Sequence, residues 1–286
     1  MTHLPALRVR ARLLSVAALS LLISAVWAPG AVAASDYTIP QAEMAMVNAL
    51  NADRVAVGLV PVQVDGRLMA IARGRSVDMA TKHYFSHTQP DGKKVFSILS
   101  GNAVKWYSAG EIIAWNNSST LTSSTAGANR QWMNSPGHKA IVVSKTFNYV
   151  GVGLAIDATN GHKMWTAVYI KGPDRTGAVA TARTPLVANS STVGTRRVTL
   201  NWSGVDVPLQ TLTSGLASFT VQRRVDGGAW ATVLSATTAL TLSQDLATGH
   251  AYEFRVAARD KAGNIGAWST VGTSAATLRR VIVAHG

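Results

Sequence analysis

Residues 132–138 read Trp-Met-Asn-Ser-Pro-Gly-His, a stretch that starts a helix and places a histidine in its first turn. Serine caps helix N-termini, and proline is favoured in the first turn because it has no amide hydrogen to leave unpaired. The stretch therefore predicts a helix that begins at Pro136, with Ser135 as its cap. Two interpretations of His138 remain open: it organises this helix start, or it lines a functional cleft.

Two earlier segments each carry a further polar candidate. Residues 109–115 read Ala-Gly-Glu-Ile-Ile-Ala-Trp, which sets Glu111 among apolar neighbours, and residues 78–87 end in His87, just before the turn at 89–92. With His138, these segments supply two histidines and one carboxylate.

Apolar spacing predicts the elements around these segments. Recurrence at three and four residues indicates helices, alternation indicates strands, and runs of serine, threonine and asparagine indicate loops. The predicted elements are helices over 39–57, 65–82 (capped by Asp65) and 126–133, a loop over 115–126, and strands over 149–156 and 163–170 joined by a turn at Asn160-Gly161.

The order of these motifs resembles a known family. The three segments, together with Asn51-Ala-Asp-Arg54, Leu68-Met-Ala-Ile-Ala-Arg73, Phe147 and Val150-Gly-Val-Gly-Leu154, are similar to the bacterial branch of the CAP superfamily of cysteine-rich secretory, antigen-five and plant pathogenesis-related proteins. The resemblance implies an α-β-α sandwich over residues 39–172. It also implies a cleft that gathers His87, Glu111 and His138, which is described across the family as a divalent-metal site.

The resemblance makes His87, Glu111 and His138 the candidate catalytic residues, with His87 and His138 as candidate metal ligands. Two imidazoles and a carboxylate suit a divalent metal such as zinc and would leave one coordination position open. The same groups can move protons without a metal, or Glu111 can bridge the histidines structurally. The sequence indicates no cofactor other than such a metal.

The chain departs from that family pattern at two positions. It reads Gly-Glu-Ile where relatives generally read Gly-Glu-Asn, so Ile112 replaces an amide, and it has Ser135 where eukaryotic members place a second acid. Fewer polar groups leave fewer ways to activate water. The departures therefore favour a binding role over catalysis.

The remainder of the chain predicts an all-β domain. Residues 173–183 form a linker of small residues, and alternating segments such as 198–202, 219–223 and 252–256 follow it. Over 184–280 their order resembles a fibronectin type III domain, an immunoglobulin-like sandwich. The resemblance implies that Trp202 lies between two sheets and that Tyr252 bonds back to the backbone as a tyrosine corner. For Trp230 and Trp268, core packing is favoured over a sugar-stacking strip.

The N-terminus and the composition predict export. Residues 1–34 place three arginines before an apolar run and end in Ala-Val-Ala-Ala, the layout of a signal peptide; a retained membrane anchor is the alternative. Removing them lowers the formal net charge from +13 to +10, and the mature chain has no further apolar stretch of spanning length. The basic residues form no dense run, which argues against nucleic-acid binding. The chain has no cysteine, so burial alone must hold its cores.

Three functions are compatible with this α+β chain. The favoured one is a secreted or envelope-associated protein that binds an extracellular lipid, a cell-wall polymer or a glycan, with the fibronectin-like domain as a spacer. A second is a peptide hydrolase, metal-dependent or general-base, that uses His87, Glu111 and His138; members of the superfamily have been proposed as proteases. A third is a protein that binds partner proteins through its β domain. The sequence indicates no oligomeric state.

Overall fold

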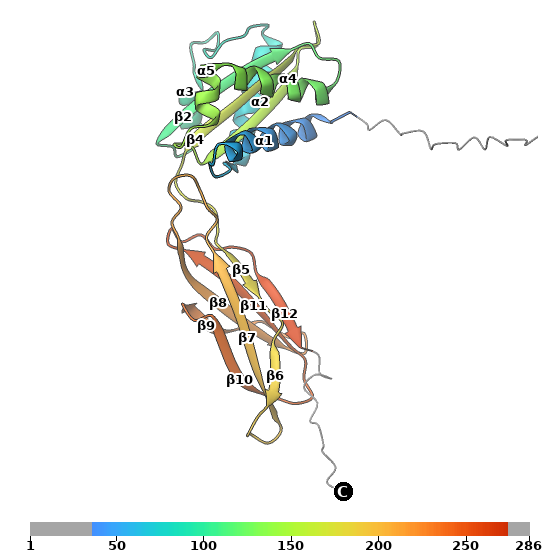
Figure 1. Ribbon diagram of the computed structural model, residues 1–286, viewed down its shortest axis with the longest axis vertical. Helices are drawn as coiled ribbons and strands as arrows, with labels where there is room; N and C mark the ends of the chain where they lie inside the picture. Colours follow the sequence, from blue (N-terminus) through green and yellow to red (C-terminus); the bar gives the residue numbers. More distant parts are fainter. Residues whose placement is uncertain (1–35, 274–286) are drawn as a thin grey trace, which may run out of the picture. The chain divides into compact units, whose positions relative to one another are not determined.

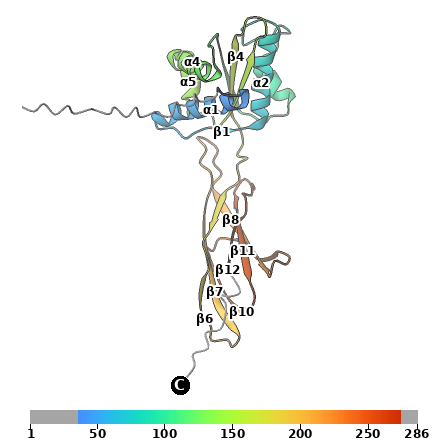
Figure 2. The same cartoon turned by 90° about the vertical axis from the view of Figure 1, so that its right-hand side faces the viewer.

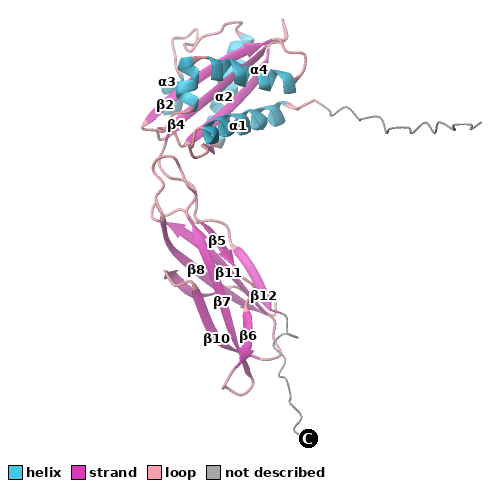
Figure 3. Cartoon of the chain, in the orientation of Figure 1, coloured by secondary structure: helices cyan, strands magenta, loops and turns pink. Residues whose placement is uncertain are grey.

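The structure, a computed structural model, describes residues 36–273 (Figure 1). The predicted signal peptide and residues 274–280 of the predicted fibronectin-like domain lie outside that range. Both helices and strands occur up to Lys171, and the described residues beyond it contain strands and loops only (Figure 3). The mixed α+β class is therefore confirmed.

One four-stranded sheet forms the centre of the N-terminal domain. Its order is β1-β3-β4-β2, and all neighbours are antiparallel except β1 and β3. The strands are β1 (Gln63–Val64), β2 (Ser108–Asn116), β3 (Tyr149–Ile156) and β4 (Lys163–Lys171). The predicted strands correspond to β3 and β4. β2 has no alternation to reveal it, because residues 110–114 are buried on both faces.

Helices cover both faces of this sheet. α1 (Ile39–Ala56), α4 (Leu121–Asn134) and α5 (Pro136–Val142) share one apolar core with the sheet, and α2 (Gly66–Thr81) and α3 (Val95–Gly101) share another. Figure 2 shows the strands between α4 and α5 on one side and α2 on the other. The expected α-β-α sandwich is present.

Local signals explain where the helices begin. Thr38 and Gln41 form a capping box at α1, and the Asp65 carboxylate accepts from the amide of Arg67 at α2, as its predicted cap. α4 begins at Leu121, five residues before the prediction, so the expected loop is wrong over its second half. The threonine and serine residues that suggested a loop instead supply a capping box, Thr120 with Ser123.

Two glycines set the distance between β3 and α2. A Cβ atom on Gly151 would lie 2.1 Å from the carbonyl carbon of Leu68, and one on Gly153 would lie 2.1 Å from the amide nitrogen of Arg73. No side chain fits against a helix backbone at that distance. The Val150-Gly-Val-Gly-Leu154 motif therefore lets the helix backbone rest directly on the strand.

Two polar side chains tie α1 to the rest of its domain. Asn51 exchanges hydrogen bonds with the backbone of Val62, and the buried Arg54 donates to the carbonyls of Val142 and Ser144 at 2.8 Å each. Carbonyls at a helix C-terminus lack partners within the helix. Arg54 thus satisfies the end of α5 and fixes that short helix.

The C-terminal domain contains two sheets around a second core. One holds β5 (Val179–Ala182), β6 (Leu186–Asn189), β7 (Thr195–Val205) and β10 (Thr241–Ala247), and the other holds β8 (Leu216–Val225), β9 (Ala231–Thr237), β11 (Tyr252–Asp260) and β12 (Ser269–Thr273). Trp202 lies in the shared core, and the Tyr252 hydroxyl donates to the carbonyl of Ala247 at 3.2 Å. Both side chains take the expected roles. The fibronectin type III assignment itself stays a prediction.

Two expectations for this part of the chain are corrected. Residues 179–182, assigned to the linker, form β5 and pair with β7, because Ala178 and Ala180 are small enough to be buried in the core. Trp268 is 38% exposed, and the Arg255 guanidinium lies 4.4 Å from the ring centroids of both Trp230 and Trp268. Core packing is therefore wrong for these tryptophans, which form a cation-π stack with arginine.

Candidate functional site

Strand β2 directs Glu111 and Ile112 to opposite faces of the sheet. Ile112 is fully buried in the core shared with α1, α4 and α5. Glu111 is on the other face, where it meets Arg75 of α2. The replacement of the family's asparagine by Ile112 therefore enlarges a core and leaves the surroundings of Glu111 intact.

Glu111 forms a buried ion pair with Arg75. The Arg75 Nε atom donates to Glu111 Oε1 at 2.8 Å, and both side chains are at least 96% buried. The two guanidinium NH groups donate to the Tyr84 hydroxyl and the Ser86 carbonyl, each at 2.8 Å. Burial disfavours the charge, but the attraction of Glu111 outweighs it, so the pKa of Arg75 is raised.

Arg75 is not among the residues that the sequence predicts for the site. Its signal is positional: Leu68, Ala72 and Met79 mark the buried face of α2, and Arg75 falls on that same face. A buried arginine requires an anion, because an uncompensated charge in an apolar interior is costly. An arginine on the apolar face of a helix thus predicts a buried acidic partner.

His87 completes this arrangement at the surface. Its Nδ1 atom lies 2.8 Å from Glu111 Oε2, and its side chain is 51% exposed. Arg75 also holds the backbone of the adjacent Ser86. Arg75 therefore holds both Glu111 and the backbone next to His87 in place. Nε2 is the imidazole nitrogen that Glu111 does not engage.

His138 lies in the first turn of α5, as predicted. Ser135 is its N-cap residue, although the serine side chain makes no capping bond. Burial, and then the charge of His87, lower the pKa of His138. The imidazole is therefore neutral at neutral pH, and it is near enough to His87 for the two to repel when both are charged.

The three predicted site residues line two hollows. His87 and Glu111 line one of about 300 Å³, whose other walls come from Lys94, Val95, Phe96, Ala109, Gly110 and Ile141. We call this hollow the His87 cleft. His138 lines another of about 490 Å³, with Phe85, Trp115 and Trp132 among its walls. The structure thus brings His87 and Glu111 together and places His138 beside them in a separate hollow.

The arrangement does not match a three-ligand metal site. Within residues 36–273, a single group of three metal-ligating side chains has its ligand atoms within 4.8 Å of one another, and it is in the C-terminal domain. Both Glu111 oxygens already have partners, Arg75 and His87. Zinc binding by His87 and His138 stays a prediction, and no step of the function proposed below requires a metal.

Two further histidines flank this region. His83 has a positive φ of 52°, and its Nδ1 atom lies 2.9 Å from the buried Asp157 carboxylate. His162 stacks on Trp115, with ring centroids 4.3 Å apart. Each of these histidines therefore has a partner within the domain.

Comparisons with known proteins identify the N-terminal domain. Residues 47–169 match the model of the cysteine-rich secretory protein family, CAP. The chain is 32% identical over 128 residues to the uncharacterized protein YkwD of Bacillus subtilis strain 168, covering 45% of this chain and 46% of YkwD. It is 29% identical over 129 residues to the uncharacterized membrane protein YlbC of the same organism, covering 45% of this chain and 34% of YlbC. The chain thus spans less than half the length of these relatives.

A solved structure gives a similar match. An extracellular protein containing an SCP domain, from Bacillus anthracis strain Ames, shares 26% sequence identity, with a TM-score of 0.41 over 48% of this chain and 45% of that one. Among the described residues of the present chain, no helix has both the length and the apolar character needed to cross a bilayer.

Proposed function

We propose that this protein is an extracellular binding protein whose ligand occupies the His87 cleft. The match of residues 47–169 to the CAP family model supports this proposal. The ligand class that we favour is an amphipathic molecule with an acyl chain, such as a lipid. A cell-wall polymer and a glycan are the other candidates.

The observation that carries this proposal is the state of Glu111. A general base must lie within hydrogen-bond reach of the proton that it removes. Glu111 is buried, Arg75 engages Oε1, and His87 engages Oε2. The carboxylate supports the wall of the cleft, which favours binding over catalysis at that position.

The walls of the His87 cleft favour an amphipathic ligand. Phe96 is 41% exposed although it is a large apolar residue, and Ile141 and Val95 extend the apolar wall. His87 and Lys94 supply polar groups at the same cleft. An acyl chain against Phe96 with an anionic group near Lys94 would satisfy both kinds of wall.

We also propose export and a spacer role for the rest of the chain. Residues 1–34 have the signal-peptide pattern, and the buried Trp202 and the Tyr252 hydrogen bond are features that a fibronectin type III domain would have. In this proposal the β domain takes no part in binding the ligand of the His87 cleft, and it separates the CAP domain from an attachment surface.

Equilibrium binding of a fluorescent fatty acid to the purified protein tests the proposal. Phe96→Ala removes an apolar wall and is expected to weaken binding about tenfold, a loss typical of one buried aromatic contact. The matched control is Tyr107→Ala, which removes another exposed aromatic that does not line the cleft. No saturable binding, or equal loss in both variants, contradicts the lipid; pull-down with peptidoglycan and glycan arrays then decides between the other classes.

One observation keeps a hydrolase as the second candidate. Glu111 engages His87 Nδ1 and leaves Nε2 at the cleft, an arrangement in which a carboxylate orients a histidine base. Peptide and peptidoglycan libraries, with and without zinc, test it against His87→Ala, Glu111→Gln and His138→Ala. Cleavage that is lost in His87→Ala while the variant stays folded would support catalysis, and no cleavage by the intact protein would remove this candidate.

A further inference from the structure

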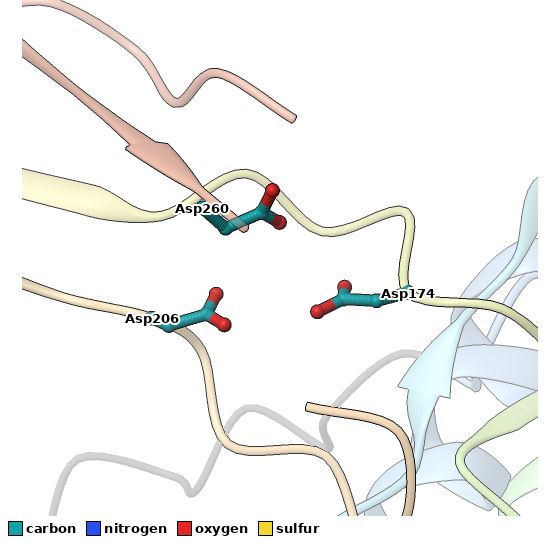
Figure 4. A group of neighbouring side chains, drawn as sticks. All are labelled: Asp174, Asp206 and Asp260. Atoms are coloured by element: carbon teal, nitrogen blue, oxygen red, sulfur yellow. The ribbon is translucent and has the colours of Figure 1, made fainter. Parts of the chain in front are cut away.

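Three carboxylates converge at one end of the C-terminal domain. Asp174 precedes β5, Asp206 follows β7 and Asp260 ends β11. One oxygen from each lies within 4.8 Å of the others, and Figure 4 shows the three side chains directed toward a common point.

The carboxylates are held in place by hydrogen bonds from the surrounding loops. Asp174 accepts from the amides of Thr176 and Ser214, Asp206 Oδ2 accepts from the amide of Gly215, and Asp260 accepts from Asn264. Asn264 also donates to the Asp174 carbonyl. These bonds position all three groups within the β domain itself.

One oxygen in this group is left without a partner. Asp206 is 7% exposed, and its Oδ1 atom is buried with no hydrogen bond. A buried carboxylate oxygen without a donor is costly, since water can no longer solvate its charge. This orphan oxygen is the observation that points to a missing cationic partner.

Among the residues that the structure describes, no basic side chain pairs with these carboxylates. None of the ion pairs found within residues 36–273 involves Asp174, Asp206 or Asp260. The ammonium group of Lys261 approaches Gly215 but makes no such pair. Asp260 is only 1% exposed. Two buried carboxylates and a half-buried one thus repel each other without an ion-pair partner in the described part of the chain.

We propose that Asp174, Asp206 and Asp260 bind a calcium ion. All of the donor atoms are oxygens. Zinc prefers nitrogen and sulfur ligands, so this set favours a hard cation instead. Oxygen atoms within 4.8 Å of one another can share a calcium ion, since ligands on opposite sides of Ca²⁺ lie about 4.6–5.2 Å apart. Calcium accepts flexible geometry, whereas magnesium demands a near-ideal octahedron. Three carboxylates on separate loops therefore favour calcium, and water completes the shell.

The ion would join three separate segments of the β domain. It would cross-link the entry into β5, the end of β7 and the end of β11, and so fix the residues that lead into the domain. The proposal stands independently of the His87 cleft, because it concerns other residues and another domain.

Thermal unfolding and calorimetric titration of the purified protein test the site. Calcium at 5 mM is expected to raise the Tm of the β domain by about 5 °C or more over EDTA, and magnesium at 5 mM much less. We expect a Kd of about 10⁻⁴ to 10⁻³ M or tighter, as in extracellular calcium modules. No calcium-dependent shift and no binding heat would overturn the proposal.

Asp206→Asn supplies the decisive variant. It is expected to abolish the calcium shift and, in EDTA, to be at least as stable as the parent, because it removes one of three repelling charges. The control Asp245→Asn removes an exposed carboxylate of the same domain that pairs with Arg197, and it should keep the full shift. Equal shifts in the two variants would overturn the proposal. If Asp206→Asn does not fold, Asp174→Asn decides in the same way.

Discussion

The Glu111 carboxylate has a structural role, because it neutralises the charge of the buried Arg75 guanidinium. Removing one partner of a buried ion pair leaves the other charge uncompensated. We expect Glu111→Gln to lower the free energy of unfolding of the CAP domain by about 3–5 kcal/mol, measured by urea denaturation.

A surface pair provides the comparison for that variant. Glu253 pairs with Arg224, and both side chains are about one-third exposed. Glu253→Gln should cost less than about 1 kcal/mol, since water screens the charges. A loss for Glu111→Gln as small as this would show that Arg75 does not need its partner.

His138 should make the CAP domain less stable in acid. Its pKa is lowered by burial and by His87, so the folded state binds fewer protons than the unfolded state below about pH 6.5. The free energy of unfolding should then fall as the pH drops from about 6.5 toward the folded pKa, and be insensitive to this group above that range. An NMR titration of the His138 ring should give a midpoint below about 6.5; a midpoint above it would contradict the burial argument.

At the residue scale, the sequence identified the polar groups but not their partners. His87 and Glu111 were named together because the motif order resembled a family, and they do meet. Arg75 was missed because it lies 36 residues from Glu111 along the chain, and no local pattern joins them. Only the folded sheet, with α2 packed on β3 and β4, brings Arg75 within reach of Glu111 in β2.

At the element scale, the close contact of β3 with α2 depends on two glycines of β3, which have no side chain. Gly153→Ala would place a methyl group 2.1 Å from the α2 backbone, so the helix must shift. We expect a loss of about 3 kcal/mol or more in the free energy of unfolding. The control is Gly74→Ala, on the exposed face of α2 with open space around it, which should gain about 0.5–1 kcal/mol. Similar effects for the two variants would contradict the close approach.

The elements that were predicted correctly are those with strong local signals. α1 and α2 have regular apolar spacing and clear caps, and β3 and β4 were found within a residue of their ends. β2 and α3 were missed, and α4 was predicted too short. A strand buried on both faces has no alternation, and the seven-residue α3 is too short for a period to emerge.

At the scale of the whole molecule, export is the property with the most direct test. Secretion from a bacterial host should release a chain that begins at Ser35, because cleavage after Ala34 removes the basic and apolar segments. Intact-mass analysis of the medium measures this. Full-length protein recovered only with the membrane would favour the retained anchor instead.

The domain organisation was predictable, whereas the functions of the parts were not. The change from helical spacing to alternation near residue 180 indicated a second, all-β domain. The calcium site could not be foreseen, because its three aspartates are 32 and 54 residues apart in sequence and none belongs to a recognisable loop motif. Such a site exists only once two sheets have brought three loops to the same end.

The most direct test of the central claim is an NMR titration of the ¹⁵N-labelled protein with dodecanoate. We predict saturable shifts centred on the amides of Lys94, Phe96 and Gly110, which border the His87 cleft, with the β domain unchanged. The absence of saturable shifts, or shifts centred away from that cleft, would contradict the assignment of the His87 cleft as the binding site.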